Sequence, residues 1–200
     1  MNDGERSDGE LVKGILDGDE TAFVCLYRKW QGAVFRFALG MTGSREAAED
    51  VTQDTFMVLF RDGRRFDPER GPLGAYLRGI ARNLVYRRFR KDGRYVELPE
   101  ELGEGRPAGE REDPAAELMR REDVQAVRAA ILELPARFRE VVVLCELEGL
   151  SYAEAAASLE IPIGTIRSRL FRARESLARG FLRAEERAPM WKRALVRLNP

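Results

Sequence analysis

The sequence contains no histidine and only two cysteines among its 200 residues. Imidazole serves most acid–base catalysis and many transition-metal sites, so its absence argues against both in this chain. Cys25 and Cys145 lie far apart, lack the spacing of metal ligands, and each stands in an apolar stretch. We therefore expect two small core side chains, with no metal site and no cofactor.

Long apolar runs are also missing. No stretch of about 18 or more apolar residues occurs, so no membrane span is predicted. The first ten residues are acidic and lack the apolar segment of a secretory signal. These features predict a protein that stays in the reducing cytoplasm.

Charge is balanced in total, at 34 Lys+Arg and 34 Asp+Glu, but it is unevenly distributed. Residues 1–60 carry 6 basic against 11 acidic side chains (−5), and residues 61–94 carry 11 against 4 (+7). Residues 95–135 carry 5 against 11 (−6), and residues 136–200 carry 12 against 8 (+4). Two basic blocks separated by an acidic one indicate either two surfaces for a polyanion or two solvated Arg-rich helices.

The acidic block contains a linker. Residues 92–116 are rich in Gly, Pro and Glu and show no helical period. We predict an all-α fold in which two small helical domains are joined by this acidic flexible linker, the second containing a helix-turn-helix. The predicted boundaries are residues 1–91 for the first domain, 92–114 for the linker, 115–183 for the second domain and 184–200 for the tail.

Periodicity and capping residues place the helices. Apolar residues recur at three- and four-residue steps from Asp19 to Met41, and Ser44 can cap a following helix. Pro72 suits the first turn of a helix that runs to about Lys91. In the second domain we expect one helix from residues 113–114 to about 132 and another from Leu134-Pro135. Residues 141–143, all valine, lie between flanks of helical period, which favours helix over strand.

The motif with the clearest functional content lies at residues 151–174. Residues 151–154 read SYAE, a capping box that opens a short helix with three alanines, and Pro162 can start a second helix. In that second helix we expect an inward apolar stripe of Ile163, Ile166, Leu170, Ala173 and Leu177. A short helix, a tight turn and a helix with outward arginine and serine predict a helix-turn-helix, whose second helix reads the major groove.

Nearly all of residues 115–180 resemble the fourth conserved domain of extracytoplasmic-function (ECF) sigma factors, most clearly in the segments LPARFREVVVL, EGLSYAEAA and IGTIRSRLFRARE. In that family this domain reads the minus-thirty-five promoter element. The resemblance implies that Arg167, Ser168, Phe171 and Arg172 face the major groove and that Thr165 and Arg174 lie near phosphates.

The first domain is similar to the same family. Residues 46–56, EAAEDVTQDTF, resemble the helix that binds the clamp of core RNA polymerase, which implies a polymerase-binding set of Glu49, Asp50, Gln53, Asp54 and Phe56. Within this set, Phe56 is expected to anchor the helix in the core, as is Val51.

Residues 76–85, YLRGIARNLV, resemble the minus-ten segment, where a base flipped from the separated strand is captured. The implied minus-ten set is Arg65, Phe66, Tyr76, Arg78, Arg82, Asn83, Arg87 and Arg88; Phe66 is equally suited to anchoring its loop in the core.

The resemblance implies a sigma factor that catalyses no reaction and directs transcription initiation in a stress or envelope response. Its partners would be the clamp and flap of core RNA polymerase, duplex and melted promoter DNA, and an anti-sigma factor that can hold it at the membrane. Two alternatives stay open. A stand-alone helix-turn-helix regulator explains only the second domain, and an enzyme of nucleic-acid metabolism lacks a phosphate-cradling loop.

Overall fold

The computed structural model describes residues 6–93 and 117–187, with side chains placed for residues 6–93 and 124–180. Both described parts consist of helices without strands, which confirms the all-α prediction. The predicted linker and tail fall almost entirely outside these ranges, and so does the predicted helix start at residues 113–114.

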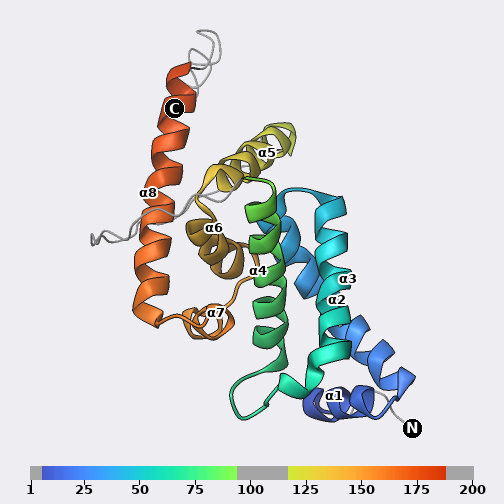
Figure 1. Cartoon of the computed structure of the whole chain (residues 1–200). Coiled ribbons are helices and arrows are strands. Elements are labelled where there is room, and N and C mark those ends of the chain that lie inside the picture. The colour runs from blue at the N-terminus through green and yellow to red at the C-terminus, as the bar shows by residue number, and fades with distance from the viewer. Residues whose placement is uncertain (1–5, 94–116, 188–200) are drawn as a thin grey trace.

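The first domain consists of α1 (Asp8–Leu16), α2 (Glu20–Thr42), α3 (Arg45–Asp62), a short 3-10 turn at Gly63–Arg65, and α4 (Leu73–Lys91). In Figure 1, α2, α3 and α4 run side by side and α1 lies across one end of α2. Their shared core holds Leu26, Phe37, Met41, Phe56 and Leu77, each at most 2% exposed.

Local capping explains where these helices begin. Asp19 accepts hydrogen bonds from the amides of Thr21 and Ala22 at the start of α2, and Ser44 accepts one from Ala47 at the start of α3. Both predicted starts are confirmed to within a residue. Helix α1 was not predicted, although Ser7 and Glu10 form the reciprocal capping box that marks its first turn.

The second domain consists of α5 (Glu117–Glu133), α6 (Ala136–Val142), a π-helical turn at Val143–Leu147, α7 (Tyr152–Leu159) and α8 (Ile163–Arg187). The triple-valine segment is helical, as predicted. The wider turn that follows it was not predicted from the sequence. Ile166, Leu170 and Ala173 are buried as predicted, but Ile163 is 43% exposed, so its assignment to the inward stripe is wrong. Ile163 is the first residue of α8, where no neighbouring turn covers it.

The two domains pack against each other. Helix α7 lies beside α4, while α8 stands on the far side of α7 (Figure 1). Helix α2 approaches α6 and the π-helical turn, and the buried apolar residues of both domains form one continuous cluster. Cys25 and Cys145 are both free and partly buried at the edge of this cluster.

Candidate nucleic-acid interface

Helix α8 carries all six predicted minus-thirty-five residues, and none of them is fully buried. Arg167 and Arg174 are exposed, whereas Thr165, Ser168, Phe171 and Arg172 are partly buried. The hydroxyl of Ser168 donates to the carbonyl of Thr165 at 3.1 Å, and Arg174 forms a 2.6 Å ion pair with Glu146. Arginines at the first turns of such a helix can pair bidentately with guanine or bind phosphate.

Helix α7, which precedes the turn into α8, has a well-defined start and end. The amide and hydroxyl of Ser151 donate to the Glu154 carboxylate at 2.9 and 2.6 Å, while the Glu154 amide donates back to the serine oxygen. These bonds hold the pKa of Glu154 below its ordinary value. At the other end, Glu160 adopts the left-handed conformation with φ 55° and ends the helix. These local features fix where α7 begins and where the chain turns toward α8.

Ser151→Ala removes half of this capping box. We expect a loss of about 1 kcal/mol in the free energy of unfolding, because the first-turn amides of α7 lose their acceptor. Urea unfolding followed by circular dichroism measures it. Ser151→Asp, which keeps an acceptor at the cap, should retain most of the stability, and equal losses in the two variants would contradict the assignment.

Five of the eight predicted minus-ten residues line a cavity of about 560 Å³. The rings of Phe66 and Tyr76 lie 5.5 Å apart in its wall, and Arg65 and Asn83 also line it. Burial raises the pKa of Tyr76 above its ordinary value. Stacking aromatics, an exposed amide and nearby cations are the groups that bind an unstacked base.

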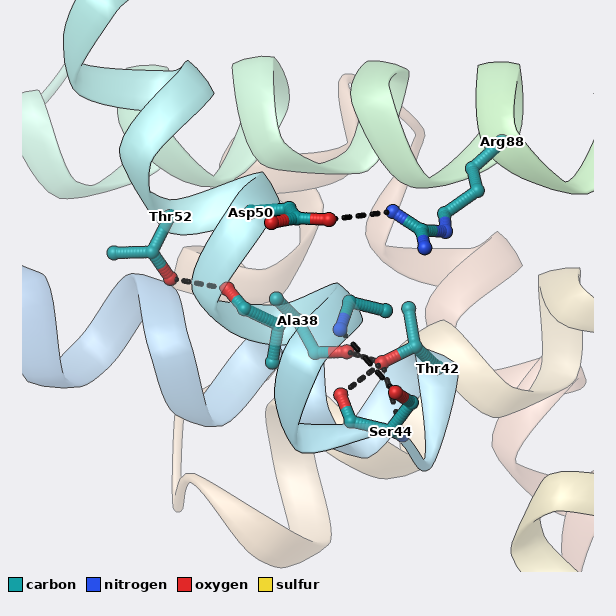
Figure 2. A network of polar contacts seen from close by, with 8 residues as sticks. Ala38, Thr42, Ser44, Asp50, Thr52 and Arg88 are labelled. Atoms are coloured by element: carbon teal, nitrogen blue, oxygen red, sulfur yellow. Dashed lines mark hydrogen bonds and ion pairs between the residues drawn. The ribbon is translucent and has the colours of Figure 1, made fainter.

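The remaining minus-ten arginines have different surroundings. Arg87 is exposed. Arg88 forms a 3.2 Å ion pair with Asp50, which Figure 2 shows bridging α3 and α4. Arg78 and Arg82 face the second domain, where they pair with Glu148 and Glu140. The structure therefore brings Arg65, Phe66, Tyr76, Arg82 and Asn83 together at the cavity and directs Arg78, Arg87 and Arg88 elsewhere.

The predicted polymerase face lies along α3. Glu49, Asp50, Gln53 and Asp54 are exposed, and Arg45 pairs with Glu49 at 2.8 Å. Phe56 is only 2% exposed and packs edge-on against Tyr27 at 4.7 Å, so it supports the helix from inside.

Two apolar side chains on α3 were missed by the sequence analysis. Met57 and Phe60 are 48% and 55% exposed, and they follow Gln53 and Asp54 along the helix. Met57 lies three and four residues after Asp54 and Gln53, and Phe60 lies three residues after Met57. This helical spacing places both near the polar set, a signal that the sequence already contained.

Comparison with known proteins assigns both domains to one protein family. The family description of sigma-70 region 2 matches residues 26–95, and that of sigma-70 region 4 matches residues 124–177. The ECF RNA polymerase sigma factor SigE of Mycolicibacterium smegmatis is 36% identical to this chain over 182 residues. The match covers 86% of this chain and 68% of the length of SigE. The RNA polymerase sigma-H factor of Pseudomonas aeruginosa is 31% identical, and the match covers 86% of this chain and 93% of the length of sigma-H. The chain belongs to the ECF group of the sigma-70 family.

A solved structure has a similar fold. CnrH in complex with the cytosolic domain of CnrY has a TM-score of 0.62 and 27% identity, and the match covers 90% of this chain and 99% of that one. The chain is thus an RNA polymerase sigma factor, and the reading as a stand-alone regulator is not favoured. Among the helices described here, none is long and apolar enough to cross a membrane.

Proposed function

We propose that this sigma factor uses three surfaces in promoter recognition. Helix α3 binds core RNA polymerase through Glu49, Asp50, Gln53 and Asp54, with Met57 and Phe60 as apolar contacts. The cavity beside α4 captures a base of the melted minus-ten element, and α8 reads the minus-thirty-five duplex. The domain boundaries proposed from the sequence, residues 1–91 and 115–183, assign the first two surfaces to one domain and the third to the other.

The observation that carries this proposal is the cavity at the minus-ten segment. Phe66, Tyr76 and Asn83 come from separate points of the chain, yet they line one cavity of about 560 Å³ beside arginines. A flipped base loses a few kcal/mol of stacking and pairing, and such a site can return that energy through aromatic contact and edge hydrogen bonds.

In vitro transcription tests the proposal. Purified core polymerase is incubated with a pool of genomic promoter fragments, with and without this chain, and RNA starts are mapped. We expect starts that require the protein and share two spaced sequence elements. No protein-dependent start, together with tight duplex binding by the chain alone, would contradict it.

Arg167 and Arg172 provide a test of base reading. If either makes a bidentate base contact, its alanine variant loses about 1–3 kcal/mol of promoter binding and accepts other bases at one position. Holoenzyme binding to duplexes substituted at each minus-thirty-five position measures this. Glu175→Ala, an exposed neighbour on α8, is the control. Uniform weakening across all sequences would make the arginine a phosphate contact instead.

The proposal extends to partners and location. The sigma factor RpoE from Bartonella quintana, which has a TM-score of 0.53 to this chain, is described in complex with the anti-sigma factor NepR. We infer that this chain is likewise held by an anti-sigma factor, which can keep it near the membrane. We place the chain in the cytoplasm, where polymerase and promoter are found. It would catalyse no reaction itself, since each proposed surface binds a partner and none contains a nucleophile paired with a base.

A further inference from the structure

The apolar face of α5 is covered over only part of its length by the described residues. Val124, Val127, Ile131 and Leu134 recur at three- and four-residue steps, so they share one side of this helix. Ile131 and Leu134 are 4% and 3% exposed, whereas Val124 and Val127 are 47% and 39% exposed. The apolar face therefore continues past its covered part, toward the beginning of α5.

A groove of about 340 Å³ lies between α5 and α8, next to this uncovered face. Ala130, Leu134 and Leu177 supply its apolar walls, and Glu133 and Arg179, which also line it, carry opposite charges. Figure 1 shows α8 continuing beyond α6 and α7. None of the residues that line the groove belongs to the polymerase, minus-ten or minus-thirty-five sets, so the groove is a separate surface.

The sequence after α8 contains an apolar stripe that needs a partner. Residues 188–200, APMWKRALVRLNP, lie outside the described residues. Trp191, Leu195 and Leu198 recur there at four- and three-residue steps, the period of a helix with one apolar face. The remaining positions include three basic residues and no acidic one. In globular proteins such a stripe is normally buried against another apolar surface.

This segment is long enough to reach the groove. Helix α8 ends at Arg187, and Gly180, which lines the groove, precedes that end by about 10 Å at a rise of about 1.5 Å per residue. Residues 188–200 would span about 20 Å as a helix and about 40 Å when extended. Pro189 lacks the amide that an unbroken α-helix needs, so the sequence favours a change of direction just after Arg187.

Charge and tethering favour the same partner. Residues 188–200 carry a net charge of +3, and α5 belongs to the acidic block of residues 95–135, whose net charge is −6. A second copy of the chain would offer the same acidic block. However, a short tether gives an attached segment an effective concentration of about a millimolar, which favours the groove of its own chain.

We propose that residues 188–200 fold back along α8 and bind as an amphipathic helix in the groove between α5 and α8, where Trp191, Leu195 and Leu198 cover Val124 and Val127. The segment then completes the apolar core of the second domain and holds the far half of α8 against α5. This inference goes beyond the proposed function and does not rest on any of the three promoter-recognition surfaces.

The fluorescence of Trp191 in the full-length chain provides the test. Its accessibility is measured by quenching with acrylamide, a small neutral molecule that reaches only exposed indoles. Trp30 is the other tryptophan of the chain, and the Trp191→Phe chain gives its signal for subtraction. Sedimentation velocity at the same protein concentrations reports the oligomeric state.

Two variants release the segment, and each has a matched control. Val127→Asp places a carboxylate on the uncovered face of α5, and Leu195→Asp places one on the stripe of the segment. Ala129→Asp and Val196→Asp introduce the same group on the other side of each helix, by helical period. Val127 is already exposed and Leu195 lies after the two domains, so neither variant disturbs the buried core.

We expect the quenching constant of Trp191 to be at least about threefold lower in the unmodified chain than in Val127→Asp or Leu195→Asp, because only chains whose segment has left the groove expose the indole. An unpaired carboxylate is costly to bury in an apolar contact, so either variant should release the segment. Both controls should match the unmodified chain. Circular dichroism verifies that the helices persist.

Equal quenching in the unmodified chain and in both variants would overturn the inference. Protection that is lost in Leu195→Asp but kept in Val127→Asp would place the segment on a different surface, which also contradicts it. Protection that grows with protein concentration, together with a dimer in sedimentation, would assign the groove to a second copy instead.

Discussion

Replacing both Asp50 and Gln53 with alanine is expected to weaken binding to core RNA polymerase by at least about a hundredfold. That ratio corresponds to about 2.7 kcal/mol, the size expected for two central contacts of an interface. Both side chains are exposed on α3, and Asp50 makes only a partly exposed ion pair with Arg88 inside the chain. Such pairs contribute little to stability, so the fold should persist.

Competition for core polymerase, followed by fluorescence, measures this loss, and circular dichroism verifies the helices. Glu46→Ala, at the exposed first turn of the same helix, is the control. Arg88→Ala adds a second comparison, because it removes the partner of Asp50 seen in Figure 2 without changing the polymerase face. Normal holoenzyme formation by the double variant would remove Asp50 and Gln53 from the interface.

Glu140→Ala is expected to lower the free energy of unfolding by about 3–5 kcal/mol. The carboxylate is fully buried and accepts from Arg82, Tyr86 and Arg169, the last at 3.0 Å. Removing the shared anion from buried cations costs far more than losing an exposed ion pair. The nearby carboxylate also raises the pKa of Tyr86, after the larger effect of burial.

Urea unfolding of the full chain measures the effect of Glu140. Glu133→Ala, an exposed glutamate on the preceding helix, should change stability by less than about 0.5 kcal/mol. Glu140→Gln retains one acceptor oxygen and should fall between the two. A loss below about 1 kcal/mol for Glu140→Ala would show that the buried ion pairs contribute no net stability.

Local features of this fold were predictable from the sequence. The capping box at residues 151–154 and the serine cap at Ser44 place helix starts because the bonds that fix them lie within three residues. The same logic could have found α1 from Ser7 and Glu10. The π-helical turn at residues 143–147 could not be found this way, because no local bond in the sequence pattern distinguishes it from α-helix.

The candidate site was predictable only in part. The resemblance to ECF sigma factors pointed to Phe66, Tyr76 and Asn83, but their convergence on one cavity depends on how the loop packs against α4. The pairing of Arg78 and Arg82 with Glu148 and Glu140 joins residues about 60 to 70 positions apart, a distance at which periodicity carries no information. The exposure of Met57 and Phe60 likewise follows from tertiary packing.

Detection of melted DNA on a mapped promoter tests the central claim most directly. Permanganate reacts with unpaired thymines, so it reports strand separation when core polymerase, the chain and the promoter are combined. The account predicts reactive thymines at the minus-ten element only when both proteins are present, and their loss in Asn83→Ala. Tight binding of the chain alone to intact duplex, with no reactive thymine in the presence of polymerase, would contradict it.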